Sequence, residues 1–309
     1  MSPRAFVAAV LVMLLTLMGA LLFSASRRDR EPDLVWGHKG VQAGDFARPR
    51  AAAIDPKGRL FIVDFTARVQ CYDLDGNHLG FTWTTPDFRN GRPSGLGIDR
   101  DGNLLVADSH YHSVRTYSFD GQELRSFGGQ AGTEPGRFGY VSDCVQDAEG
   151  FYYITEFGQN DRITKLDSNG QFVQCWGSSG QDPGQFNRAR ALALSPDGLL
   201  YVADACNHRI QVFTRSGELV RVFGEPGSKP GQLQYPYDVC FAPNGTLYVA
   251  ERGNHRIQKF DKEGRSLGTW GQAGRAPGQL ADPWALVVDS QGRVHVIDTE
   301  NHRVQRVSF

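Results

Sequence analysis

A segment of 44 to 48 residues recurs six times along this chain, and the repetition limits the possible folds more than any other feature. One turn glycine marks each unit, at Gly58, Gly102, Gly150, Gly198, Gly245 and Gly292. Six residues beyond each glycine lies an acid: Asp64, Asp108, Glu156, Asp204, Glu251 and Asp298. A fixed period of this length is typical of proteins built from stacked supersecondary units.

Each unit reads as a set of short strands. The segment 191–224 contains four apolar runs, separated by Pro-Asp-Gly, by a polar stretch ending in Asn-His-Arg, and by Ser-Gly-Glu. Short runs rich in Val, Ile, Leu, Tyr and Phe between turn formers predict β-strands. No apolar pattern with helical spacing follows Arg30. The sequence therefore predicts an all-β, six-bladed propeller with four strands in each blade.

The last unit stops after its third strand, at Phe309, so its fourth strand must come from elsewhere. Residues 34–37 (Leu-Val-Trp-Gly) match the ends of the fourth strands in the other units, such as 175–177 and 222–224. We therefore predict one propeller domain over 33–309, in which residues 33–37 close the sixth blade. Such closure protects the edges of the sheets. Residues 1–32 form a separate N-terminal segment.

The N-terminal segment contains a long apolar run. Residues 5–23 carry no charge, and a helix needs ~20 apolar residues to cross a bilayer. We expect a single-pass membrane anchor with the propeller on the extracytoplasmic side. The alternative is a signal peptide cleaved near Ser24–Ser26, which would release a secreted propeller.

Two motifs carry a family resemblance. Asn-His-Arg occurs at 207–209, 254–256 and 301–303, and Pro-Gly-Gln occurs at 183–185, 230–232 and 277–279. These motifs resemble those of the NHL repeat family. Members of that family include translational repressors that bind RNA, bacterial receptor kinases with a sensor propeller, and a zinc lyase of peptide amidation. The resemblance implies the fold and leaves the activity open.

Residues that recur in every unit are expected to serve the scaffold. The acid after the second strand and the Asn-His-Arg triplet appear in near-identical form around the ring, whereas a catalytic site is asymmetric. We expect these polar groups to tie loops together by charge-assisted hydrogen bonds, and we interpret His208, His255 and His302 as loop ties and not as ligands.

Residues that break the repeat are the candidates for function. The innermost strand of each blade begins near one mouth of the channel, at Arg50, Ser94, Val141, Arg190, Tyr237 and Trp284. None of these is a zinc ligand, although the resembling lyase holds zinc near this position. Loops on the same face add Phe65, His110, Tyr111, Phe157 and Arg252.

Arginine together with exposed Trp and Tyr is typical of binding sites. We predict a ligand-binding site at the mouth, and the alternative is that these side chains only fill the channel. The predicted ligand-binding residues are Arg50, Arg190, Tyr237, Trp284 and Arg252.

The sequence favours binding over catalysis, and it predicts no catalytic residue, no metal and no cofactor. We expect a binding or scaffold module for a peptide, glycan or protein partner, with an anionic or aromatic group at the mouth. A metal-dependent lyase or lactonase with its site in the channel is the alternative, and RNA binding is the third reading. The net charge of -1 and the acidic turns of the opposite face argue against nucleic acid.

Overall fold

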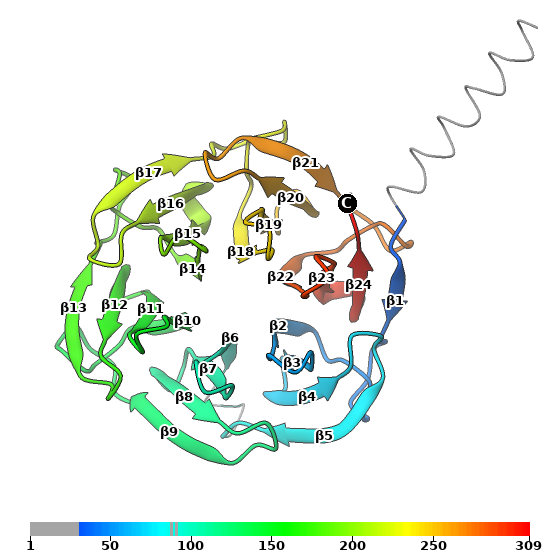
Figure 1. The fold of residues 1–309 in the computed structure, drawn as a ribbon, viewed down its shortest axis with the longest axis horizontal. Helices are drawn as coiled ribbons and strands as arrows, with labels where there is room; N and C mark the ends of the chain where they lie inside the picture. Colours follow the sequence, from blue (N-terminus) through cyan, green and yellow to red (C-terminus); the bar gives the residue numbers. More distant parts are fainter. Residues whose placement is uncertain (1–30, 87–88, 90–91) are drawn as a thin grey trace, which may run out of the picture.

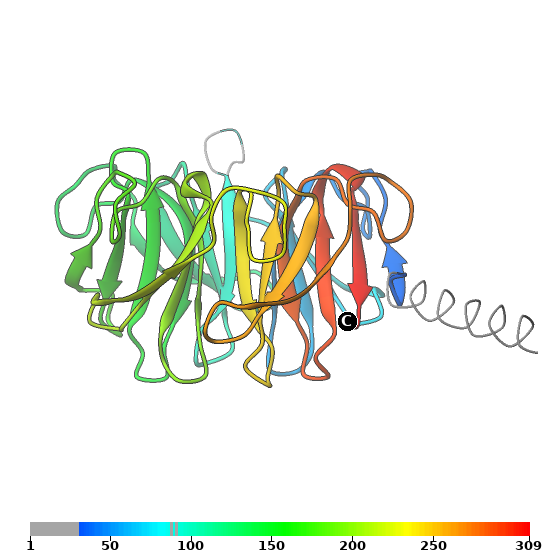
Figure 2. The same ribbon diagram turned by 90° about the horizontal axis from the view of Figure 1, so that it is seen from above.

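The computed structural model describes residues 31–86, 89 and 92–309, which form six four-stranded sheets around a central axis (Figure 1). Neighbouring strands within every sheet are antiparallel. Seen edge-on, the sheets stand side by side in a disc (Figure 2). This arrangement confirms the predicted six-bladed β-propeller.

The first three blades follow the chain in order, each from the innermost to the outermost strand. Blade one consists of β2 (Pro49–Ile54), β3 (Leu60–Asp64), β4 (Arg68–Tyr72) and β5 (His78–Thr84). Blade two consists of β6 (Pro93–Ile98), β7 (Leu104–Asp108), β8 (Ser113–Tyr117) and β9 (Glu123–Gly128). Blade three consists of β10 (Tyr140–Gln146), β11 (Tyr152–Phe157), β12 (Arg162–Leu166) and β13 (Phe172–Trp176).

The next two blades have the same order. A short 3-10 helix, η1 (Ala205–Asn207), precedes the third strand of blade four, and another, η2 (Thr299–Asn301), precedes the third strand of blade six. Blade four consists of β14 (Ala189–Leu194), β15 (Leu200–Asp204), β16 (Arg209–Phe213) and β17 (Leu219–Phe223). Blade five consists of β18 (Pro236–Phe241), β19 (Leu247–Glu251), β20 (Arg256–Phe260) and β21 (Ser266–Trp270).

Blade six combines segments from distant parts of the sequence. It consists of β22 (Pro283–Val288), β23 (Val294–Asp298), β24 (Arg303–Val307) and β1 (Leu34–Trp36). In β1, Leu34 pairs with Arg306 and Trp36 pairs with Val304. The ring of Trp36 also lies 4.6 Å from that of Tyr72 in blade one. The division of the whole chain into an N-terminal segment and one domain stays a prediction.

The hydrophobic core consists of layers between adjacent blades. One cluster joins each neighbouring pair, and the cluster around Phe46, Tyr72 and Ile297 joins blade six to blade one. Strands β3, β7, β15, β19 and β23 are buried along their whole length. Since each blade covers its neighbours, burial of apolar surface stabilises the ring as a whole.

The predicted N-terminal anchor lies outside the described residues, as does part of the divergent segment 89–92. Within the part of the chain that the structure describes, no helix has the length and apolar character needed to cross a bilayer.

Candidate functional site

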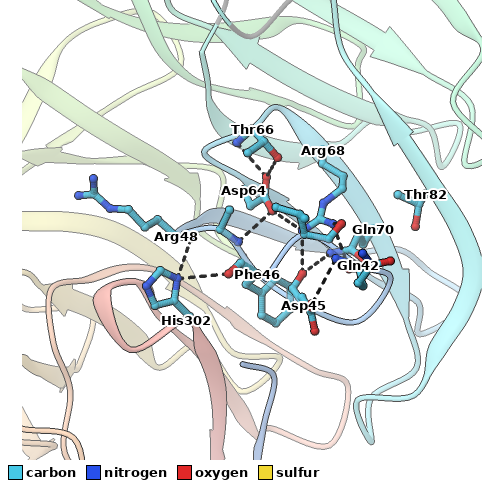
Figure 3. Close-up of polar contacts among 12 residues, drawn as sticks. Gln42, Asp45, Phe46, Arg48, Asp64, Thr66, Arg68, Gln70, Thr82 and His302 are labelled. Carbon is cyan, nitrogen blue, oxygen red and sulfur yellow. Dashed lines mark hydrogen bonds and ion pairs between the residues drawn. The ribbon is translucent and has the colours of Figure 1, made fainter. Parts of the chain in front are cut away.

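The repeated acids act as buried anchors for the loops. In blade one, Oδ2 of Asp64 accepts hydrogen bonds from the backbone N–H of Ala47 (3.1 Å) and from Nη2 of Arg68 (2.8 Å), as Figure 3 shows. In blade four, Nε of Arg209 donates to Oδ2 of Asp204 at 2.8 Å. The structure confirms that these acids and arginines are scaffold residues, since their polar groups face one another.

The repeated histidines connect neighbouring blades. The Nδ1 atoms of His302, His208 and His255 each accept a hydrogen bond of 3.1 Å, from the backbone N–H of Arg48, Tyr235 and Asp282 respectively. The bond from Arg48 to His302 is drawn in Figure 3. The predicted role of these histidines as loop ties is confirmed.

The residues that receive these ties have an unusual backbone. Arg48, Tyr235 and Asp282 have φ values of 57°, 48° and 50°, in the left-handed region that non-glycine residues rarely occupy. Each lies two residues before a candidate site residue. Such strain persists where the surrounding structure enforces it, and it is concentrated at functional sites.

A β-bulge in each blade then turns one side chain out of the regular ladder. The pairing of the first two strands skips one residue in every blade, for example Arg50 between Pro49 and Ala51. The skipped residues are Arg50, Ser94, Ser142, Arg190, Tyr237 and Trp284. Bulges re-aim side chains and are common beside binding sites.

The assignment of Val141 to this set was wrong. Val141 pairs regularly with Glu156, and the bulge falls one residue later, at Ser142. Ser142 lies seven residues after Pro135, the same distance at which the bulge residues of blades four, five and six follow the proline of their Pro-Gly-Gln motifs, so the count for blade three was one residue short. Val141 is fully buried in the layer between blades two and three.

Four of the bulge residues meet at the mouth of the channel. The guanidinium carbon of Arg50 lies 4.6 Å from the ring centre of Trp284, and that of Arg190 lies 5.5 Å from the same ring. Arg190 also lies 4.9 Å from the ring centre of Tyr237, and the two aromatic rings are 5.5 Å apart. We call Arg50, Arg190, Tyr237 and Trp284 the mouth cluster.

Arg252 belongs to the same region, but its charge is already paired. Its Nε and Nη2 donate to Oδ2 of Asp282 at 3.0 and 2.9 Å, and its Nη1 donates to the hydroxyl of Tyr237 at 3.2 Å. Arg252 therefore positions Tyr237, and the structure brings all five predicted site residues together.

Several donors of the mouth cluster have no hydrogen-bond acceptor among the described residues. These buried atoms are Nε and Nη1 of Arg50, Nε of Arg190 and Nε1 of Trp284. Buried polar atoms are almost always satisfied in native proteins, so a group of them in one place requires an explanation. The side chains of all three residues line one channel cavity of about 300 Å³.

Burial, and to a lesser degree nearby like charges, disfavour the charged forms of the two arginines of the mouth cluster. Burial, with the like charges of Arg190, Arg92 and Arg48, lowers the pKa of Arg50 to about 9. Burial also lowers the pKa of Arg190, and the charges of Arg188 and Arg252 act in the same direction. The site is therefore arranged so that a bound negative charge would relieve an existing cost.

Sequence reasoning missed the arginines that surround the mouth cluster. The guanidinium carbons of Arg48 and Arg92 lie 5.5 and 5.2 Å from the ring centre of Phe65, and that of Arg50 lies 5.4 Å from it. Arg188 lies 5.0 Å from the ring centre of Phe157. Arg48 and Arg188 stand two residues before a bulge, and that spacing could have revealed them.

The other half of the mouth, in blades two and three, has small bulge residues. Oγ of Ser94 contacts Oγ of Ser109 at 2.8 Å, and Oγ of Ser142 donates to the carbonyl oxygen of Ala189 at 2.8 Å. These serines connect loops and blades. Of the predicted loop residues, His110 and Phe157 lie 5.5 and 5.4 Å from the ring of Tyr140.

Two carboxylates, buried Asp143 and half-buried Asp238, line the same cavity and were also missed. Each follows its bulge residue directly, at a position that the other blades fill with Ala51, Gly95, Ala191 and Ala285. That Asp143 and Asp238 replace Ala or Gly at this position could have been recognised from the sequence. Among the described residues, no group of three or more His, Cys, Asp or Glu side chains could hold a metal ion.

The fold and the closed ring define the class of protein, a six-bladed β-propeller. The family model described as NHL repeat matches residues 186–213, 233–260 and 280–307, which belong to blades four, five and six. Blades four, five and six of this propeller therefore consist of NHL repeats.

Curated proteins are similar in sequence to part of this chain. Rat peptidylglycine alpha-amidating monooxygenase is 38% identical over 133 residues, which cover 39% of this chain and 13% of that protein. Mouse NHL repeat-containing protein 3 is 30% identical over 165 residues, or 51% of this chain and 45% of that protein. The chain thus spans a small part of the amidating enzyme and less than half of the second relative.

Solved structures share the fold at low identity. A streptogramin B lyase superposes with a TM-score of 0.62 at 14% identity, covering 87% of this chain and 95% of that one. A gluconolactonase from Xanthomonas campestris superposes with a TM-score of 0.64 at 16% identity, covering 91% and 89%. These likenesses concern the fold alone.

Proposed function

We propose that this protein is a binding module whose channel mouth takes an anionic group of a peptide, glycan or protein partner. The observation that carries the proposal is the set of buried, unpartnered donors on Arg50, Arg190 and Trp284. Two guanidinium groups lie over the indole of Trp284, and both have an Nε–H without an acceptor among the described residues. Guanidinium donors match the geometry of carboxylate and phosphate oxygens.

Each member of the mouth cluster has a distinct role in this proposal. Arg50 and Arg190 donate to the anion, and Trp284 adds an indole N–H and a flat apolar surface. Tyr237 extends that surface and is held by Arg252, which Asp282 keeps in place. The site is asymmetric, as a specific binding site must be, because blades two and three contribute only serine at the bulge.

A ligand screen tests the proposed function. Carboxylates, phosphate esters and sulfate esters are screened by thermal shift and then titrated against the wild type, Arg190→Met and Arg265→Met. Arg265→Met is a matched control, because Arg265 is exposed in a turn of the opposite face and its loss changes the net charge equally. We expect Arg190→Met to weaken binding at least tenfold, since truncating a buried arginine anchor costs ~2 kcal/mol or more.

The control should bind as tightly as the wild type. An anion that binds Arg190→Met as tightly as it binds the wild type would show that the mouth cluster only fills the channel.

We also propose that residues 5–23 hold the propeller at a membrane, on the extracytoplasmic side. The support is the uncharged apolar run, whose length suits a bilayer. The full chain should remain in the membrane fraction after carbonate extraction. Recovery of a soluble protein that begins near Arg27 would instead show a cleaved signal peptide.

A further inference from the structure

The channel cavity has a second polar zone directly below the mouth cluster. Asp143 and Asp238 line it, and they come from blades three and five, on either side of the blade that carries Arg190. Each is one residue beyond its bulge, so each lies one step deeper along the innermost strand than Ser142 or Tyr237. The cavity therefore contains cationic groups at its mouth and carboxylates inside.

Both carboxylates make defined backbone contacts. Oδ1 of Asp143 accepts from the N–H of Cys144 at 2.9 Å, and its Oδ2 accepts from Leu192 of the next blade at 3.1 Å. Asp238 repeats this arrangement with the N–H groups of Val239 (2.8 Å) and Leu286 (2.9 Å). A carboxylate offers about four lone-pair positions, so each keeps acceptor capacity towards the cavity.

The propeller fold does not require an acid at this position. Blades one, two, four and six have Ala51, Gly95, Ala191 and Ala285 there, and they form the same innermost strands. Buried Asp143 and half-buried Asp238 carry a desolvation cost that alanine would avoid. The two acids therefore need a reason beyond the scaffold, and the cavity that they share supplies one.

The charges of this zone are not balanced by the protein. Burial raises the pKa of Asp143 to about 6, and burial together with the Asp143 charge raises the pKa of Asp238 well above its usual range. Arg190 acts on both carboxyls in the opposite direction, but its own Nε remains without an acceptor among the described residues. A cationic group between the two carboxyls would stabilise their ionised forms.

We propose that the ligand of the channel is a small zwitterion, with a carboxylate held by Arg50 and Arg190 and an ammonium group held by Asp143 and Asp238. The inference rests on the proposed function and specifies the class of its ligand. Arg190 is only 7% exposed and lines the same cavity, and its Nε–H has no acceptor in the described part of the chain, so the cavity wall offers a donor as well as the two carboxyls. The rings of Trp284 and Tyr237 offer an apolar surface for the carbon skeleton.

The size of the cavity limits the ligand. A volume of about 300 Å³ is at the lower end of the range for small-molecule sites. An amino acid, or the terminal residue of a peptide, has both charged groups within that space.

Four related probes test the inference by isothermal titration of the full wild-type chain at neutral pH. They are 3-phenylpropanoate, L-phenylalanine, 3-amino-3-phenylpropanoate and phenethylamine, which share a phenyl ring and differ in their charged groups. We expect one of the two amino acids to bind at least tenfold tighter than 3-phenylpropanoate and than phenethylamine.

The outcomes separate the inference from the proposed function. Equal binding of 3-phenylpropanoate and both amino acids overturns the zwitterion and leaves anion binding in place. Tightest binding of phenethylamine overturns both. If no probe binds while another anion does, the inference alone is overturned; if no anion binds either, both are overturned.

A variant provides a second test that does not depend on the strength of binding alone. Asp238→Ala introduces the residue that blades four and six already carry at this position. The preference for the amino acid over 3-phenylpropanoate should fall to near one, while the affinity for 3-phenylpropanoate is kept or improved. A folded Asp238→Ala protein that retains the wild-type preference would contradict the inference.

Discussion

At the scale of the residue, the candidate site depends on a short backbone arrangement found in blades one, five and six. A residue in the left-handed region, such as Arg48 or Asp282, is tied by a histidine of the preceding blade, and two residues later a bulge turns one side chain into the mouth. The bulge itself recurs in all six blades, but the side chain that it presents differs. A repeated scaffold can thus hold an asymmetric site.

The buried ion pairs of the scaffold give a prediction about stability. Arg256→Met removes the guanidinium that donates to Oε1 of Glu251 at 2.6 Å, and leaves a buried carboxylate with its amide partners only. We expect the free energy of unfolding to fall by about 3 kcal/mol in urea titrations, because an uncompensated buried charge is costly.

The exposed pair of Arg265 with Asp261 is the control for this change. Arg265→Met should alter the free energy of unfolding far less than Arg256→Met does, because exposed surface ion pairs contribute little. Equal effects of the two substitutions would contradict a structural role for the repeated acids.

Asp143 gives a prediction about pH. Its pKa rises from its ordinary value to about 6 in the folded protein, so the folded state binds this proton more tightly than the unfolded state. The stability that this group contributes is therefore lost as pH rises from about 4 to about 6, by roughly 3 kcal/mol.

The comparison is between the wild type and Asp143→Asn, whose side chain does not titrate. As pH rises through this range, the free energy of unfolding of the wild type should fall relative to that of the variant. Parallel curves between pH 4 and pH 8 would show that Asp143 is not perturbed by its burial.

At the scale of the element, β1 is the strand on which ring closure depends. It pairs with β24, and Trp36 lies against Phe46 and Tyr72 of the neighbouring blade at 5.5 and 4.6 Å. Deleting residues 1–40 should therefore lower the melting temperature by roughly 5–10 °C, whereas deleting residues 1–30 should leave it unchanged. Equal melting temperatures for the two truncations would contradict this role of β1.

The sequence predicted the elements better than it predicted the site. Turn glycines and apolar runs recur with a fixed period, so strands and blade number follow from local patterns. The bulge at Ser142 was misplaced by one residue, although Ser142 follows Phe138 at the same four-residue distance at which Arg190 follows Phe186. Arg48, Arg188, Asp143 and Asp238 were missed, since their significance depends on which side chains meet across the channel.

At the scale of the whole molecule, the propeller is a closed ring. The apolar layers between blades stabilise it, and the side chains at its mouth differ from blade to blade. The mouth cluster combines side chains from blades one, four, five and six, which no single repeat contains. Its buried donors and mutual repulsion reduce stability in the absence of a ligand, a relation that is common at functional sites.

The most direct test of an anion site at the mouth is the free energy of unfolding of the wild type and of Arg50→Met, with and without 3-phenylpropanoate. Without the ligand, we expect Arg50→Met to be as stable as the wild type or more stable by up to ~2 kcal/mol, because a repelled charge with unsatisfied buried donors is removed. With the ligand, only the wild type should gain stability, by linkage. A variant that is clearly less stable without ligand, and that gains as much as the wild type with it, would contradict an anion site at the mouth.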